Sequence, residues 1–181
     1  MELETARLRL RPFTPADADD LYRLYSDPEV MRYIGQGTVR TREQTAEALA
    51  KMIDEWGQHG FGMWALFDRR DGRFLGRCGL RPLPGTPEVE LGYTLFKEAW
   101  GKGLATEAAR ASVAFGFEKL ALPRIVAIAH PPNRASRRVM EKVGMRFERQ
   151  APYQDIDCVW YAAHRADYLA APRAEPTWPT T

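Results

Sequence analysis

The sequence has few cysteines and histidines, and this scarcity excludes two common kinds of site. Its 181 residues include two cysteines, Cys78 and Cys158, and three histidines, His59, His130 and His164. Two cysteines are too few for a disulfide framework, and the dispersed histidines and cysteines lack the spacing of a metal site. We therefore expect no bound metal, two small buried thiols and a reducing compartment, the cytoplasm.

The sequence also lacks a long apolar run and an excess of charge of one sign. No apolar stretch reaches the roughly 20 residues that span a bilayer, and the opening Met1-Glu2-Leu3-Glu4 does not resemble a secretory signal. Twenty-six lysines and arginines oppose twenty-four aspartates and glutamates. Neither nucleic acid nor a membrane is therefore an expected partner, and any anion-binding site must be local.

Strand and helix patterns are present in a mixed order. Alternating or continuous apolar residues predict strands at 7–11, 61–67, 73–80, 89–96, 124–129, 145–149 and 158–164. Helical spacing and capping residues predict helices at 14–26, 41–60, 103–120 and 134–143. This order predicts an α+β sandwich, a mixed and mostly antiparallel sheet flanked by about four helices. We expect residues 1–171 to form a single domain and the proline-rich residues 172–181 to form a mobile tail.

The stretch from Trp100 to Ala108 has the character of an anion site. It joins a predicted strand to an amphipathic helix and reads Trp-Gly-Lys-Gly-Leu-Ala-Thr-Glu-Ala. Its two glycines let a ligand approach the backbone, and the free N–H groups and positive dipole end of the helix favour a phosphate. Lys102 adds a cation and Thr106 a hydroxyl. Neither a Walker nor a Rossmann spacing fits, and taken alone the glycines suit a structural turn equally well.

A second segment, Asn133 to Met145, reads Asn-Arg-Ala-Ser-Arg-Arg-Val-Met-Glu-Lys-Val-Gly-Met. Together with Val89-Glu90-Leu91-Gly92-Tyr93 and the loop at 100–108, it resembles the GNAT superfamily of acetyltransferases. Within that superfamily it is most similar to the branch of the ribosomal-protein N-terminal (alanine and serine) acetyltransferases. The likeness extends to residues 5–12 and 27–33, and so spans nearly the whole chain.

The resemblance implies acetyl-CoA as acyl donor and a sheet splayed between the fourth and fifth predicted strands. Pantetheine amides would then pair with the open strand edge, and Gly92 would permit a bulge there. Trp100 stands where the family usually has Gln or Arg, but backbone N–H groups hold the pyrophosphate, so we expect binding to survive. The implied cofactor-binding residues are Tyr93, Leu95, Trp100, Gly101, Lys102, Gly103, Leu104, Ala105, Thr106, Asn133 and Arg137.

Two of these residues have alternative readings that the sequence leaves open. Asn133 also suits the N-cap of the following helix, and Arg137 suits a solvated helix face.

Acetyl transfer to an amine requires oxyanion donors, a proton donor for the leaving thiolate and an acceptor for the amine proton. Backbone N–H groups near Tyr93 would polarise the carbonyl. By the family match Ser136 is the first candidate for the acid, with Tyr161 as a second donor; a capping role for Ser136 and a packing role for Tyr161 remain open.

For the base, Glu90 is the first candidate because it faces away from Val89 and Leu91, and it would act through water. A surface carboxylate remains its alternative reading. Asp155 and Asp157 are other candidates, and with Glu88 and Glu90 they would form an acidic mouth that attracts a cationic amine.

The acceptor itself is not encoded in any pattern. It is a protein N-terminus or a small amine such as a polyamine, amino acid or antibiotic, and a non-catalytic CoA-binding module is the alternative from another class. The oligomeric state, monomer or homodimer, is equally open. Phe61, Met63 and Trp64 suit the core better than a dimer face.

Overall fold

The computed structural model describes residues 1–171, so the expected mobile tail at 172–181 lies outside the described residues. The strands are β1 (Leu3–Glu4), β2 (Leu8–Pro12), β3 (Met63–Asp68), β4 (Phe74–Pro82), β5 (Val89–Leu95), β6 (Arg124–Ala129), β7 (Arg146–Tyr153) and β8 (Ile156–His164). The helices are α1 (Ala18–Tyr25), α2 (Pro28–Met31), α3 (Arg42–His59), α4 (Leu104–Glu118), α5 (Arg134–Lys142) and α6 (Arg165–Ala170), with one-turn 3₁₀ helices at Pro15–Asp17 and Lys97–Ala99.

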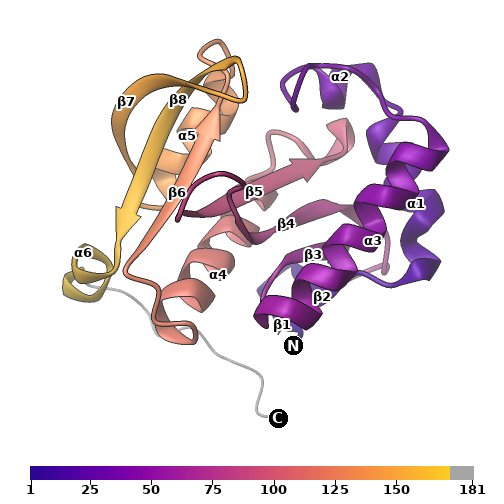
Figure 1. Ribbon diagram of the computed structural model, residues 1–181. Helices are drawn as coiled ribbons and strands as arrows, with labels where there is room; N and C mark the ends of the chain where they lie inside the picture. Colours follow the sequence, from indigo (N-terminus) through magenta and orange to yellow (C-terminus); the bar gives the residue numbers. More distant parts are fainter. Residues whose placement is uncertain (172–181) are drawn as a thin grey trace.

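All of these strands belong to one eight-stranded sheet with the order β1-β2-β3-β4-β5-β6-β8-β7 (Figure 1). Neighbouring strands are antiparallel except β5 and β6, which are parallel. The predicted fold class is therefore confirmed. The two-residue β1 and the short helices α2 and α6 are additions to the elements expected from the sequence.

The sheet splays open between β5 and β6, as the resemblance implies. The register between these strands contains a single pair, Glu90 with Val126, and the two strands diverge beyond it (Figure 1). By contrast, β4 and β5 stay paired from Gly76 with Leu95 to Pro82 with Val89. The backbone of β5 beyond Glu90 is therefore paired on one edge and open on the other.

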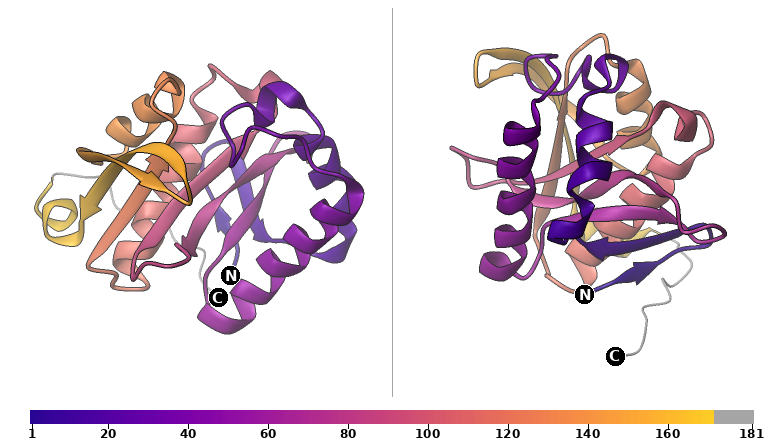
Figure 2. Two further views of the ribbon diagram at one scale, coloured as in Figure 1. Left: turned by 45° about the horizontal axis from the view of Figure 1, so that its top comes forward. Right: turned by 90° about the vertical axis from the view of Figure 1, so that its right-hand side faces the viewer.

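Helices cover both faces of the sheet. Figure 2 shows α1 and α3 on one side and α4 and α5 on the other. Between α4, α5 and the sheet lies an apolar cluster that includes Trp64, Leu80 and Phe115, and between α1, α3 and the sheet lies a second one that includes Leu24 and Met63. Met63 and Trp64 are 1% and 0% exposed, which confirms that they belong to the core.

The termini of α3 follow the capping pattern in the sequence. Thr41 accepts a hydrogen bond from the Gln44 N–H, and the Gln44 side chain accepts one from the Thr41 N–H, which forms the predicted capping box. Gly60 ends the helix in the left-handed conformation with φ 71°. These contacts fix the position of α3 over the sheet and so the wall that it gives to the site described below.

The bulge expected at Gly92 is wrong for the pairing of β4 with β5, which runs without a register shift. Gly92 contributes to packing instead. A Cβ built there would stand 2.8 Å from the terminal methyl of Met63, and so the missing side chain makes room for core packing. The splay arises instead from the divergence of β6.

No helix among residues 1–171 combines the length and the apolar character needed to cross a membrane. The cytoplasmic location stays a prediction.

Candidate active site

A cleft of about 700 Å³ opens where β5 and β6 separate. One wall is formed by β5, the loop after it and the first turn of α4, and the other by the end of β6 and the start of α5. The segment around Tyr33 to Gly35 and the turn between β7 and β8 also contribute lining residues. The cleft therefore gathers the two segments that the sequence singled out, although 30 residues separate Gly103 from Asn133.

The open edge of β5 offers unpaired backbone groups to the cleft. The Phe96 N–H is bonded to the Leu75 carbonyl on β4 at 2.9 Å, and consecutive residues of a strand present their N–H and C=O groups to opposite edges. The N–H and C=O groups of Tyr93 and Leu95 consequently face the open side. The Trp100 indole occupies the Leu95 carbonyl at 2.8 Å, which leaves the remaining groups for an extended ligand with amides of its own.

The loop before α4 presents the N-terminal end of that helix to the same cleft. Gly101 and Gly103 have φ of 70° and 77°, a region that glycine adopts without strain. Gly103 is the N-cap and contributes no side-chain cap, so the first N–H groups of the helix are free to bind a ligand. Leu104, Ala105 and Thr106 line the cleft directly behind it. Such a helix N-terminus suits a pyrophosphate.

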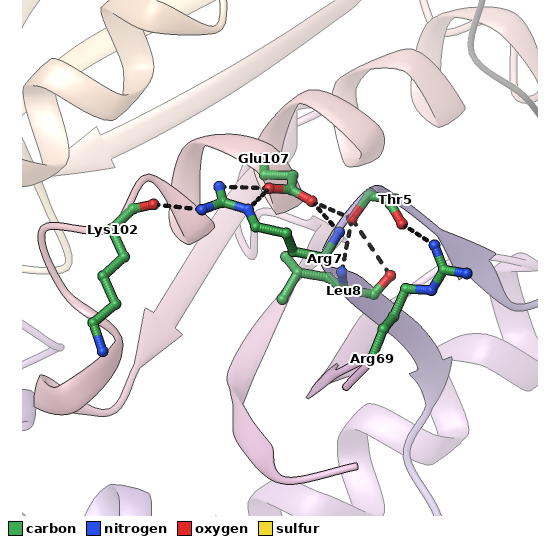
Figure 3. Close-up of polar contacts among 6 residues, drawn as sticks. All are labelled: Thr5, Arg7, Leu8, Arg69, Lys102 and Glu107. Carbon is green, nitrogen blue, oxygen red and sulfur yellow. Dashed lines mark hydrogen bonds and ion pairs between the residues drawn. The ribbon is translucent and has the colours of Figure 1, made fainter. Parts of the chain in front are cut away.

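Lys102 contributes to this loop through its backbone carbonyl, whereas its charge suggested a contact with an anion. Its backbone carbonyl accepts a hydrogen bond from Arg7 Nη1 at 2.9 Å, and its side chain extends away from that contact (Figure 3). The residues that line the cleft include Gly101 and Gly103 on either side of it, but not Lys102. A contact between the Lys102 ammonium and a phosphate stays a prediction.

Arg7 and Glu107 brace the loop from outside the cleft. The Glu107 carboxylate accepts hydrogen bonds from Thr5 Oγ1 at 2.6 Å, from the Arg7 N–H at 2.9 Å and from Arg7 Nε at 2.6 Å (Figure 3). Burial raises the pKa of Glu107, but these bonds outweigh it and leave that pKa below its ordinary value. Arg7 thus ties the first strands to the first turn of α4 and to Lys102.

Two hydroxyl groups meet across the cleft. Tyr93, on β5, lies with its Oη 2.9 Å from the Ser136 Oγ and donates to the Ser136 carbonyl at 2.9 Å. Burial raises the pKa of Tyr93 far above its ordinary value, so the phenol stays protonated. Asn133 accepts from the Ser136 N–H at 3.1 Å, and the structure therefore confirms its alternative reading as the N-cap of α5. Its CoA contact stays a prediction.

Arg137 and Tyr161 bind each other on the far side of α5. The Arg137 Nε donates to the Tyr161 hydroxyl at 3.2 Å, and Tyr161 donates to Glu141 at 3.1 Å. Arg138 lines the cleft and Arg137 does not. The contact of Arg137 with the cofactor stays a prediction, and no pattern in the sequence distinguishes between the two arginines.

Glu90 lines the cleft on the face of β5 opposite Leu91, as predicted, and it is 5% exposed. Its carboxylate is paired with Arg81, with Nη2 at 2.7 Å. The other three carboxylates do not gather beside it. Glu88 pairs with Arg124 at 3.3 Å, and Asp155 and Asp157 are exposed and absent from the cleft lining. The expected acidic mouth is wrong.

Cationic side chains occupy that position instead. A second cavity of about 460 Å³ adjoins the cleft under α3, and Arg40, Arg77 and Arg81 line both spaces. Glu55, from α3, is buried in the wall of the second cavity. The sequence reasoning missed these residues. The available signal was the spacing of Arg77 and Arg81, which places two cations on one face of an otherwise apolar strand.

No group of three or more His, Cys, Asp or Glu side chains suited to a metal ion occurs in the part of the chain that the structure describes. Both cysteines are free and buried.

Comparison with known proteins identifies the family. The GNAT acetyltransferase domain matches residues 7–146. The Bacillus subtilis protein YkkB is 35% identical over 156 residues, which cover 82% of this chain and 87% of that protein. The FsC-acetyl coenzyme A-N(2)-transacetylase of Aspergillus fumigatus is 32% identical over 184 residues, 92% of this chain and 77% of that enzyme.

Solved structures of other proteins support the same family assignment. An acetyltransferase from Agrobacterium tumefaciens superposes with a TM-score of 0.81 at 31% identity, over 91% of this chain and 94% of that one. RimL, a ribosomal L7/L12 alpha-N-protein acetyltransferase in complex with coenzyme A, shares the fold with a TM-score of 0.77 at 19% identity, over 91% and 98% of the two chains. Together with the open β5 edge and the free start of α4, these findings show that the chain belongs to the GNAT acetyltransferase family and is an N-acetyltransferase that takes its acetyl group from acetyl-CoA.

Proposed function

We propose that the protein transfers the acetyl group of acetyl-CoA directly to a primary amine, with the hydroxyl pair of Ser136 and Tyr93 donating to the leaving thiolate through Ser136 Oγ and with Glu90 as the base. The observation that carries this proposal is the hydroxyl pair of Tyr93 and Ser136, 2.9 Å apart inside the cleft between β5 and α5. Donors held at a fixed position stabilise charge where it develops, without reorganisation during the reaction.

The chemistry of the cleft supports direct transfer rather than a covalent acyl-enzyme. Cys158 lines the cleft, but it is 4% exposed and its burial raises the pKa of the thiol, which makes it a weak nucleophile. The free N–H groups of Tyr93 and Leu95 on the open edge of β5 supply the donors for the thioester oxygen.

The proposed base, Glu90, lines the cleft and pairs with Arg81, which lines both the cleft and the second cavity. An amine that enters from that side reaches the thioester with Glu90 beside it, and the carboxylate accepts the amine proton through water. The acceptor amine belongs to a small molecule or to a protein N-terminus, and the residues around the second cavity bear on that choice.

The test is release of CoA thiol from acetyl-CoA over a panel of primary amines. We expect Tyr93→Phe and Ser136→Ala each to lower kcat by about 10- to 100-fold, and the double variant to lower it by less than the product because the two hydroxyls act as a unit. Ser26→Ala, at the end of α1 and outside the cleft lining, is the matched control.

The outcomes separate the parts of the proposal. Unchanged kcat in both hydroxyl variants would refute their role as donors, and unchanged kcat and pH profile in Glu90→Gln would remove it as the base. Binding of acetyl-CoA without thiol release for any amine would favour the non-catalytic CoA-binding module.

A further inference from the structure

Arg77 is a buried cation without a carboxylate partner in the described residues. It is 8% exposed, its Nη1 contacts the Met63 sulfur at 3.4 Å, and its Nε has no hydrogen-bond partner. A buried guanidinium of this kind is costly, because it has lost water without gaining an anion. Since Arg77 lines both the cleft and the second cavity, a ligand in either space can reach it.

Arg40 brings a second cation to the same place. The guanidinium carbons of Arg40 and Arg77 lie 4.6 Å and 5.6 Å from the centre of the Tyr25 ring. Burial is the main cause that lowers the pKa of Arg40; Tyr25 opposes it, and the neighbouring Arg77 and Arg81 lower that pKa further. The positive charges of Arg40 and Arg77 therefore lie close together, and their attraction to the Tyr25 ring does not neutralise them.

Two buried carboxylates lie near these guanidinium groups, and the exposed Glu47 and Lys51 that also line the second cavity carry opposite charges. Glu90 is committed to Arg81 through two nitrogens, with Nε at 2.8 Å and Nη2 at 2.7 Å. Glu55 is 8% exposed and its Oε2 has no partner, so it is not paired with Arg77. Three guanidinium groups thus face two buried carboxylates around the junction of the two spaces.

The location of these cations relates them to the acceptor rather than to the donor. The pyrophosphate seat lies at the start of α4, which packs on the opposite face of the sheet from α3 (Figure 2). Arg77 and Arg81 sit on the face of β4 that α3 covers, in register with Thr94 and Glu90 of β5. An amine that approaches Glu90 from the second cavity passes these arginines.

We propose that the acceptor is a small primary amine that also carries an oxyanion, a carboxylate or a phosphate, bound by Arg40 and Arg77 beside Glu90. This inference rests on the proposed transfer to an amine. Planar guanidinium groups match the oxygens of either anion, and such charge-assisted bonds are strong when desolvated. A cavity of about 460 Å³ fits a molecule of amino-acid size. A polycation such as a polyamine would meet repulsion from three arginines in the same space.

The experiment compares matched amines by thiol release from acetyl-CoA, using the full chain. Each L-amino acid is paired with its α-amide, and O-phosphoethanolamine with ethanolamine; spermidine and C-terminally amidated peptides that begin with Ala or Ser complete the panel. We expect at least one anionic amine to exceed its neutral partner in kcat/KM by about 10- to 100-fold. The pair that shows the preference distinguishes a carboxylate from a phosphate.

Variants test the residues. In Arg77→Met and in the half-buried Arg40→Gln we expect the ratio of anionic to neutral kcat/KM to fall about 10-fold or more, while KM for acetyl-CoA stays within about twofold. Arg77→Lys should keep part of the preference because it keeps the charge. Arg73→Gln, whose side chain is 61% exposed at the β3–β4 turn, is the control and should keep the full ratio.

The result that would overturn the inference is turnover of neutral amines, spermidine or amidated peptides at least as efficient as that of every anionic amine. An unchanged ratio in both arginine variants would overturn it as well. These outcomes differ from failure of the proposed function itself, in which no amine of any charge releases thiol.

Discussion

Glu107→Gln tests whether the brace behind the pyrophosphate loop supports acetyl-CoA binding. The substitution keeps the shape of the side chain but replaces one carboxylate oxygen with an N–H donor. That donor then faces Thr5 Oγ1, the Arg7 N–H and the Arg7 guanidinium, which now donate to the carboxylate at 2.6–2.9 Å. At least one of these donors loses its acceptor.

The expected cost follows from the number and exposure of these bonds. A hydrogen bond to a charged group contributes about 1.5–3 kcal/mol, but Arg7 is half exposed, with 50% of its side chain accessible, against 17% for Glu107. Solvent therefore weakens the interaction of the exposed Arg7 guanidinium with Glu107. We expect a loss of about 2 kcal/mol in the free energy of unfolding, which lowers Tm by roughly 4–8 °C in a domain of this size.

The same change should raise KM for acetyl-CoA severalfold, because Arg7 then holds the Lys102 carbonyl less firmly. Thermal unfolding followed by circular dichroism and steady-state thiol release measure the two effects. Glu2→Gln is the control, since Glu2 pairs with Arg9 at 2.9 Å on the surface with 49% exposure. A lowered Tm with an unchanged KM would show that the Glu107 contacts contribute to stability but not to acetyl-CoA binding. No change in either quantity would refute the reasoning.

The lowered pKa of Glu107 gives this prediction a pH dependence. Because the folded pKa lies below the unfolded one, the stabilisation is complete above the unfolded value of about 4.5. It is lost as the pH falls through the folded pKa. The difference in unfolding free energy between wild type and Glu107→Gln should therefore shrink on acidification below about pH 4.5, and a constant difference down to pH 2 would contradict the assignment.

Two further predictions concern the sheet core and are measured by chemical unfolding and by thiol labelling. Gly79→Ala should lower the free energy of unfolding by more than about 3 kcal/mol, because its Cβ would stand 2.4 Å from the rigid Gly62 carbonyl oxygen. Gly92→Ala should lower it by about 1 kcal/mol, because its Cβ meets only the flexible end of Met63 at 2.8 Å. Equal losses for the two variants would contradict this reasoning. Burial raises the pKa of Cys78 to about 12, so its thiol should resist a disulfide reagent at pH 8 until the protein unfolds, and rapid labelling of the native protein at Cys78 would contradict that.

Most of the fold could be predicted from the sequence because its helices and strands are long and their apolar residues recur at regular spacing. Strands such as β2 and helices such as α3 bury one face, and that face leaves a repeating apolar pattern. The elements that the sequence did not predict, β1, α2 and α6, have two, four and six residues. Segments this short carry no period, and their positions depend on contacts with distant parts of the chain.

The candidate site could be predicted from the sequence only where backbone geometry determines it. Gly101 and Gly103 permit positive φ just before a predicted amphipathic helix, so the sequence predicts a backbone turn and a free helix start there, although it does not by itself show what binds. Arg7 begins the alternating pattern that predicts a strand at 7–11, yet its main contacts are with Glu107, 100 residues away. No local pattern encodes such a partner. The spacing of Arg77 and Arg81 was a local signal for the second cavity, but the approach of Arg40 and Glu55 to them depends on how distant parts of the chain pack.

The open edge of β5 has a consequence for the behaviour of the folded protein in solution. Unpaired strand edges attract other polypeptide strands and promote aggregation unless they are covered. This edge lies within the cleft, and beside it the His130 ring nitrogen lies 3.0 Å from the Gly35 carbonyl oxygen, which joins the end of β6 to the segment after α2. Another protein strand would have to enter the cleft to pair with β5. The walls that shape the donor site therefore also oppose edge-to-edge association of the sheet.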